Sequence, residues 1–265
     1  MPDASGGRSA GLSSVRNAAR LLREFAVESE LGVTDVARRL GVGTSTAFRL
    51  LTTLHEDRLL ERADAPGRYR LGLVVYELGV TVFPQTGLHE AAVPVLANLR
   101  HSTGETVQLA VLDQLEVVFI ERLESPQTLP FVAGVGHRMP AHATSTGKVL
   151  LAYLPPEVLA ARLQDWVPVR FTRHTISSKA ALLADLQRVA ARGWAQNVEE
   201  STLGAVSLAA PIRDGGGAVV AALSVVLPVT RADRSAVRSC TAAVLAAGET
   251  ISRRLGWSPD RPRSR

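Results

Sequence analysis

The chain has one cysteine, only two lysines and no long apolar run. Cys240 has no second cysteine to pair with, so the sequence excludes an internal disulfide and any cysteine-rich metal site. No stretch of about 18 apolar residues is present, and the N-terminus MPDASGGRSAG lacks the apolar core of a signal peptide. The six histidines are scattered without the short spacings of zinc sites. We therefore expect a cytoplasmic protein that uses no metal and no cofactor.

Because lysine is scarce, arginine supplies 28 of the 30 basic residues, and the pI is about 10.1 although the net charge is only +5. So modest a charge does not by itself indicate a nucleic-acid partner, and the placement of the arginines has to decide. The 265 residues are 46% hydrophobic and 21% charged, which is typical of a folded protein with two domains.

Residues 13–72 carry the pattern of three helices followed by a hairpin. The segment VTDVARRLGVG predicts a short helix that begins at Thr34 and ends at Gly41, and TSTAFRLLTTLHEDRLL predicts a third helix with Thr44 as its N-cap. Helical spacing places Ala47, Leu51 and Leu54 on one buried stripe of that third helix. The other sides carry short hydroxyl side chains and one arginine, which suit a helix that approaches DNA closely. The candidate DNA-binding residues on this helix are Thr44, Ser45, Thr46, Phe48, Arg49 and Thr53.

The hairpin LLERADAPGRYRLG places Arg62, Arg68 and Arg70 around a Pro-Gly turn, where they could straddle phosphates as a basic wing. An ordinary three-helix bundle with a solvated polar face is the alternative, but the complete order of elements favours a winged helix-turn-helix. Residues 1–72 hold 11 arginines against nine acidic residues, a net charge of +2. Because phosphate neutralisation supplies most non-specific affinity, we expect at least two copies to bind a palindromic, double-stranded operator.

The segment HATSTGKVLLA, residues 142–152, permits three interpretations. A phosphate-binding loop would need glycine where His142 stands and a hydroxyl where Val149 stands, so that interpretation fails. The pattern S-x-x-K, formed by Ser145 and Lys148, leaves open a hydrolase or acyl-transfer enzyme with an appended helix-turn-helix-like bundle, but its partner motifs S-D-N and K-T-G are absent. The third interpretation is a binding-pocket wall, in which small polar residues at a helix N-terminus attract anionic or polar oxygens and Lys148 is solvated. In the same region of the chain, the adjacent Glu199 and Glu200 would point to opposite faces of a strand.

Beyond residue 100 the pattern is mixed α/β. Strands are expected within 105–125, within 130–140 and over 194–199, 205–212 and 217–227. Helices are expected over 145–154, 156–164 and 179–193, and a final helix begins near residue 233.

The motifs VTDVARRLGVGTSTAFRLLTTLHEDRLLE, RYRLG, MPAHATSTGKVLLA and GWAQNVEESTLGAVSLAAPIRDGGGAVVAALSVVLPVTR occur in this order. Together they resemble the IclR family of bacterial transcriptional regulators. The resemblance implies an α+β two-domain fold: an N-terminal winged helix-turn-helix, a linker helix and a C-terminal GAF-like α/β effector-binding domain. It also implies a homodimer formed through the DNA-binding half, which can pair into a tetramer. The expected function is ligand-responsive regulation, more often repression, of a catabolic or secondary-metabolic operon. The expected domains are a flexible tail (1–12), the DNA-binding domain (13–72), the linker helix (73–88), the effector-binding domain (89–257) and a basic disordered tail (258–265).

By the same resemblance, the motifs place an effector pocket in the C-terminal domain, for a small organic molecule of carboxylic-acid or aromatic type. The expected effector-binding residues are Leu129, Thr144, Ser145, Thr146, Asn197, Ser207, Ser224 and Val226. Family members often have an acidic residue in place of Asn197, a cysteine in place of Ser207 and a hydroxyl side chain in place of Val226. These departures favour a larger, partly apolar effector.

Overall fold

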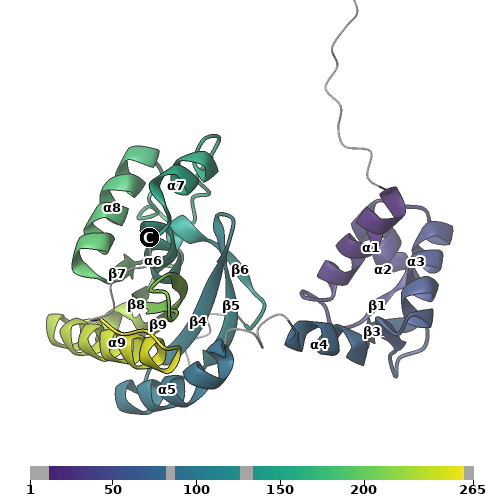
Figure 1. Ribbon diagram of the computed structural model, residues 1–265. Coiled ribbons are helices and arrows are strands. Elements are labelled where there is room, and N and C mark those ends of the chain that lie inside the picture. The colour runs from purple at the N-terminus through teal and green to yellow at the C-terminus, as the bar shows by residue number, and fades with distance from the viewer. Residues whose placement is uncertain (1–11, 82–86, 126–133, 260–265) are drawn as a thin grey trace, which may run out of the picture. The chain divides into compact units, whose positions relative to one another are not determined.

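The computed structural model describes residues 12–81, 87–125 and 134–259, which fall into two compact units, 1–84 and 85–265 (Figure 1). Leu129 of the expected pocket lies outside the described residues. Among the described residues, no helix is both long and apolar enough to cross a bilayer.

The first unit contains three helices, a small sheet and a fourth helix. In chain order these are α1 (Ser13–Glu24), β1 (Leu31–Gly32), α2 (Val33–Leu40), α3 (Thr44–Glu56), β2 (Leu60–Arg62), β3 (Arg68–Leu71) and α4 (Leu73–Val80). The antiparallel sheet has the order β1-β3-β2, so β2 and β3 form the predicted wing hairpin. Ala47, Leu51 and Leu54 of α3 are buried against α1 and α2, as the helical spacing predicted.

The starts of the two recognition-motif helices differ from the prediction by one or two residues. Helix α2 has Gly32 as its N-cap instead of Thr34, and the Asp35 carboxylate accepts the Gly32 N–H at 3.2 Å. Helix α3 has Gly43 as its N-cap, so Thr44 is its first helical residue. Gly41 ends α2 as predicted, in the left-handed conformation (φ 69°) that a residue with a side chain rarely adopts. The turn between α2 and α3 is therefore set by glycines.

The second unit is a six-stranded antiparallel sheet covered on both faces. Its elements are α5 (Leu88–Thr103), β4 (Thr106–Asp113), β5 (Glu116–Leu123), β6 (Arg138–Pro140), η2 (Ala141–Ala143), α6 (Ser145–Ala152), α7 (Pro156–Arg162), α8 (Lys179–Arg192), β7 (Ala195–Val198), β8 (Ala205–Arg213), β9 (Val219–Pro228), η3 (Val229–Arg231) and α9 (Arg234–Arg254). The strand order is β6-β5-β4-β9-β8-β7. Helices α5 and α9 lie on one side of the sheet, and α6, α7 and α8 lie on the other (Figure 1). This arrangement confirms the predicted α+β fold.

Alternation along the central strands explains why the two faces differ. Val107 and Leu109 of β4, with Leu223 and Val225 of β9, pack against α5 and α9 in one apolar core. The opposite face carries small apolar residues, such as Ala110, where α6 and α8 pack. Farther along the same face the side chains become polar, and a cavity forms there.

Candidate nucleic-acid interface and ligand pocket

All six residues predicted to bind DNA from α3 are exposed on the first unit: Thr44, Ser45, Thr46, Phe48, Arg49 and Thr53. Phe48 is 53% exposed, so its ring is accessible on the surface of the helix. A single helix therefore presents hydroxyls, a guanidinium and an aromatic ring together, and these groups can contact phosphates, base edges and thymine methyl groups.

The three wing arginines have different surroundings. Arg62 is exposed, and its guanidinium lies 5.3 Å from the centroid of the Tyr69 ring. Arg70 contacts the Glu61 carboxylate at 2.6 Å, and this pair is about half exposed. Arg68 instead points into its own domain, where its guanidinium lies 3.3 Å from the Asp35 carboxylate and donates to the Glu30 carbonyl at 3.2 Å. Arg68 thus joins the wing to α2, a role that its sequence position does not indicate.

The second unit contains a cavity of about 320 Å³ on the polar part of the sheet face, beside the N-terminus of α6. Its polar lining consists of Thr106, Gln108, Arg122, His137, Thr144, Ser145, Thr146, Asn197, Ser201, Thr202, Ser207 and Ser224. Its apolar lining consists of Phe119, Met139, Phe171, Ala205 and Val226. All seven of the described residues that were expected to bind the effector line this one cavity.

The register of the strands explains why these residues lie together. Val226 of β9 pairs with Ser207 of β8, and Ser207 pairs with Asn197 of β7, so these three side chains form one row across the sheet. Ser224 lies two residues before Val226 and therefore points to the same face. On the other side of the row, Thr106 of β4 also pairs with Val226. Strand pairing thus converts positions far apart in the sequence into one polar floor.

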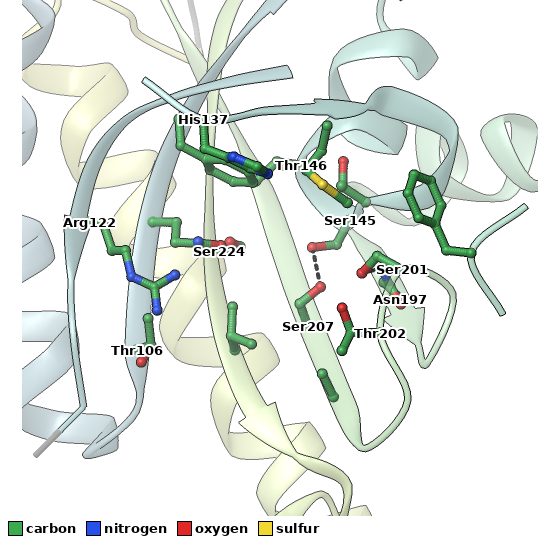
Figure 2. A pocket seen from close by; sticks show the side chains of 17 residues that line it. Thr106, Arg122, His137, Ser145, Thr146, Asn197, Ser201, Thr202, Ser207 and Ser224 are labelled. Atoms are coloured by element: carbon green, nitrogen blue, oxygen red, sulfur yellow. Dashed lines mark hydrogen bonds between the residues drawn. The ribbon is translucent and has the colours of Figure 1, made fainter. Parts of the chain in front are cut away.

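The N-terminus of α6 forms a wall of the cavity. Thr144 is the N-cap, and its hydroxyl accepts the Gly147 N–H at 3.0 Å. Ser145 shares a hydrogen bond of 2.8 Å with Ser207 (Figure 2). Thr146 is 1% exposed, and its hydroxyl has no hydrogen-bond partner within the described structure. A buried polar atom without a partner is costly, so this hydroxyl has the surroundings of a group that binds a ligand.

Gly147 is required by the packing of the wall itself. A Cβ atom at this position would lie 2.2 Å from the carbonyl oxygen of Ala141, a backbone atom that cannot easily move. The absence of a side chain therefore lets η2 and α6 touch.

The prediction that Lys148 is solvated is wrong. It is 2% exposed, and its ammonium lies 2.6 Å from the Glu200 carboxylate and 3.1 Å from the Asp185 carboxylate. Glu200 follows β7 rather than lying on it, because Glu199 turns the chain with a φ of 56°. The expectation that Glu199 and Glu200 lie on a strand is therefore also wrong.

The buried carboxylates of this cluster respond differently to their surroundings. Burial raises the pKa of Glu200, and the charge of Lys148 offsets only part of this effect. Burial also acts to raise the pKa of Asp185, but Lys148 and Arg188 outweigh it, so that this pKa is lowered. The Glu200 N–H donates to the side chain of Asn197 at 2.8 Å, and Asn197 donates to the Ala143 carbonyl at 2.6 Å. The ion cluster therefore holds the pocket residue Asn197 against the start of α6.

His142 forms a second buried support of the same wall. Its Nε2 lies 3.0 Å from the Val169 carbonyl, and its ring contacts Trp166 edge to face at 5.1 Å. Burial lowers its pKa, and the nearby charge of Lys148 adds to this effect. His142 thus connects η2, which precedes α6, to the segment that carries Phe171, which lines the cavity.

The geometry does not support the enzyme alternative. Ser145 has a hydroxyl partner, Ser207, while the Lys148 ammonium is engaged by two carboxylates. No hydrogen bond joins Ser145 to Lys148 in the described structure, so the pair lacks the contact that an activated nucleophile needs. Within the described residues, no group of three or more His, Cys, Asp or Glu side chains is arranged to hold a metal ion.

Ten of the described lining residues were not predicted, and the sequence held a signal for some of them. Thr106 and Gln108 are polar at alternate positions of an otherwise apolar strand, which indicates a polar patch on one face. Arg122 had no such signal, because Glu121 beside it is also charged and a register shift between β4 and β5 interrupts the alternation along β5. Phe171 lies in an irregular segment between helices, where no periodicity could place it.

Comparison with known proteins agrees with both units. The model of the IclR helix-turn-helix domain matches residues 14–64, and that of the bacterial transcriptional regulator IclR C-terminal region matches residues 80–253. The HTH-type transcriptional regulator XynR of Escherichia coli is 32% identical over 93% of this chain and 98% of its own length. The transcriptional repressor IclR of the same organism is 30% identical over 89% of this chain and 87% of its own.

A solved structure extends the similarity to three dimensions. An IclR homolog from Microbacterium hydrocarbonoxydans, crystallised with 4-hydroxybenzoate, is 31% identical over 92% of this chain and 99% of its own, with a TM-score of 0.81. These relatives are regulators, and none is described as an enzyme. The family models cover α3 and the described residues that line the cavity, and the chain therefore belongs to the IclR family of DNA-binding bacterial transcriptional regulators.

Proposed function

We propose that this regulator is a repressor whose affinity for its operator changes when a small organic acid binds in the second unit. In this proposal α3 enters the major groove, Arg49 contacts a guanine edge or a phosphate, and Arg62 contacts a phosphate from the wing. The exposure of Thr44, Ser45, Thr46 and Arg49 on one helix supports this assignment. Arg68 and Arg70 were expected to bind phosphates, but their ion pairs suit a supporting role in the wing.

The observation that carries the effector proposal is the hydroxyl of Thr146 at the start of α6, which is buried and has no hydrogen-bond partner among the described residues. The first residues of a helix have N–H groups without partners inside the helix, and the helix dipole adds positive potential there. A carboxylate would accept hydrogen bonds from these N–H groups and from Thr146. The carbon skeleton would then lie against Phe119, Met139 and Val226. The related protein that was crystallised with 4-hydroxybenzoate is consistent with an acid of this type.

We also propose a homodimer that binds a palindromic operator, and we keep a tetramer of paired dimers as an expectation. The charge of the DNA-binding half is only +2 over residues 1–72, so one copy would bind phosphates weakly. Leu73 and Tyr76 of α4 are each 68% exposed and Leu78 is 56% exposed, which gives an apolar surface that dimerisation would cover. Because the proposed target is genomic DNA, we place the protein in the bacterial cytoplasm.

The test combines footprinting with ligand screening. DNA from upstream of the protein's own gene should show a protected palindromic site, and acids selected by thermal shift from a panel of aromatic and aliphatic acids should change that protection. Thr146→Val keeps the side-chain shape but removes the hydroxyl, so it should weaken acid binding by about 1–3 kcal/mol without changing operator affinity in the absence of acid.

Thr250→Val removes an exposed hydroxyl on α9 and is the matched control. If no acid in the panel binds, or if both variants respond alike, the proposed effector site is wrong.

A further inference from the structure

Polar side chains on the floor of the cavity differ in whether they already have a partner. Thr106 accepts a backbone N–H at 3.0 Å, and Ser207 shares a hydrogen bond of 2.8 Å with Ser145. Gln108 and Ser224 line the same cavity and are only 6% and 1% exposed, yet within the described parts of the chain neither side chain has a hydrogen-bond partner. A buried polar group without a partner is costly, so both side chains have the surroundings of groups that bind a ligand.

Gln108 and Ser224 are placed so that one ligand group can reach both. Gln108 of β4 pairs directly with Ser224 of β9, so the two side chains leave the sheet on the same face. In such a pair the Cβ atoms are about 4.5–5.5 Å apart, a gap that one small group can bridge. Figure 2 shows Ser224 apart from the Ser145–Ser207 hydrogen bond, which marks the start of α6. The cavity therefore has a second polar place besides the helix N-terminus.

The chemistry of this pair favours a hydroxyl group as its partner. The amide of Gln108 offers both an acceptor oxygen and a donor NH₂ group, and the hydroxyl of Ser224 can also donate and accept. A ligand hydroxyl is a small group that donates and accepts at once, so it can satisfy both side chains. A carboxylate only accepts, and it would leave the amide oxygen of Gln108 without a donor. An apolar group would leave both side chains without a partner.

We propose that Gln108 is a specificity-determining residue that binds, together with Ser224, a hydroxyl group of the effector. The effector is then a hydroxylated organic acid, with its carboxylate at the start of α6 and its hydroxyl at Gln108. This inference rests on the proposed function, which places the carboxylate beside Thr146. Phe119 and Val226 also line the cavity, so the skeleton between the two polar groups is apolar.

The register of the strands sets the distance between the two polar groups of the ligand. Ser145 holds the start of α6 at Ser207, and Ser207 pairs with Val226, two residues beyond Ser224 along β9. Two residues along a strand and one strand across the sheet together separate the backbones of Ser207 and Ser224 by about 8 Å. This is too far for a carboxylate and a hydroxyl on adjacent ring atoms. The meta and para hydroxybenzoates fit, as does a chain of several carbons, whereas the ortho isomer does not.

The experiment compares matched acids by isothermal titration calorimetry on the full-length protein. The three hydroxybenzoates are compared with benzoate, and 6-hydroxyhexanoate is compared with hexanoate. The native protein should bind at least one meta, para or chain hydroxy acid about 10-fold or more tightly than its parent acid, and the ortho isomer should gain nothing. The double variant Gln108→Met with Ser224→Ala should reduce the preferred ratio to about 1.

Two further variants serve as comparisons for that loss. The double variant Gln164→Met with Ser235→Ala makes the same two changes at exposed positions outside the described lining of the cavity, and it should keep the native ratio. Thr146→Val should weaken the hydroxylated and the parent acids together and therefore also keep the ratio. Binding of benzoate by a variant shows that it is folded.

The outcomes separate this inference from the function on which it rests. If the acids bind and respond to Thr146→Val, but no hydroxylated acid is favoured, the hydroxyl site is wrong and the proposed function stands. A preference that survives Gln108→Met with Ser224→Ala overturns the assignment of these residues. A benzenedicarboxylate that binds more tightly than every hydroxybenzoate overturns the ligand class. If no acid binds the native protein, the proposed function fails and the inference fails with it. The native protein alone decides the ligand class, so the test holds even if the double variant does not fold.

Discussion

Replacing Lys148 by methionine tests the buried ion cluster that supports the pocket wall. The ammonium of this residue contacts Glu200 at 2.6 Å and Asp185 at 3.1 Å, and the side chain is 2% exposed. After the replacement Asp185 still has Arg188 at 2.9 Å, whereas Glu200 has no other ion-pair partner in the described structure. Because methionine fills a similar volume, the loss measures the removed charge and little of it comes from a cavity.

Removing one partner of a buried ion pair typically costs about 3–5 kcal/mol. That is a large part of the roughly 5–15 kcal/mol by which most domains are stable. In a unit of this size each kcal/mol lowers the midpoint of thermal unfolding by about 2–4 °C, so we expect a decrease of roughly 6–20 °C. The double variant Lys148→Met with Glu200→Gln should recover at least about 1 kcal/mol, because it no longer buries an unpaired carboxylate.

Tryptophan fluorescence during urea unfolding is a suitable assay. The three tryptophans, Trp166, Trp194 and Trp257, all belong to the second unit, so the signal reports that unit alone. Arg253→Met replaces an exposed basic residue on α9 and should change stability by less than about 0.5 kcal/mol. If Lys148→Met costs less than about 1 kcal/mol, or if the double variant is no more stable than the single one, the cluster does not support the fold as argued.

Three further predictions concern the DNA interface and the wall of the cavity. Arg49→Ala should weaken operator binding by about 1–3 kcal/mol in a gel-shift titration. The control Arg23→Ala, which replaces an exposed arginine on α1, should leave operator binding unchanged. If the two variants weaken binding equally, α3 is not part of the DNA interface. The pKa of His142 is lowered in the folded protein, so as the pH falls the unfolded chain takes up a proton at this residue before the folded protein does. The stability that neutral His142 contributes is therefore present above about pH 6.5 and is lost as the pH falls through the folded-state pKa. Urea titrations of the native protein and His142→Gln should therefore converge on acidification, and parallel curves would contradict this. Gly147→Ala should destabilise the second unit by more than about 1 kcal/mol, because its Cβ would meet the Ala141 backbone, whereas Gly134→Ala has open space and should be nearly neutral.

Much of the structure of the DNA-binding half can be predicted from the sequence, because it depends on residues that are close together along the chain. The spacing of Ala47, Leu51 and Leu54 determines which side of α3 is buried, and therefore which side carries Ser45 and Arg49. Gly41 ends α2 because the left-handed conformation there suits glycine. The ion pair of Arg68 could not be predicted in this way, since its partner Asp35 lies 33 residues away and only the packed sheet brings them together.

The pocket likewise has features that the sequence determines and features that only the tertiary structure decides. By itself the sequence determined that a helix begins at residue 145, because a helix start and the small polar residues that cap it are neighbours along the chain. Only the tertiary structure decided that Lys148 is buried, because its partner Glu200 lies 52 residues farther along and is positioned by a turn after β7. Likewise, only strand pairing places Arg122 of β5 across the cavity from α6. Periodicity indicates which side of an element faces inward, but it does not specify which distant charge will meet it there.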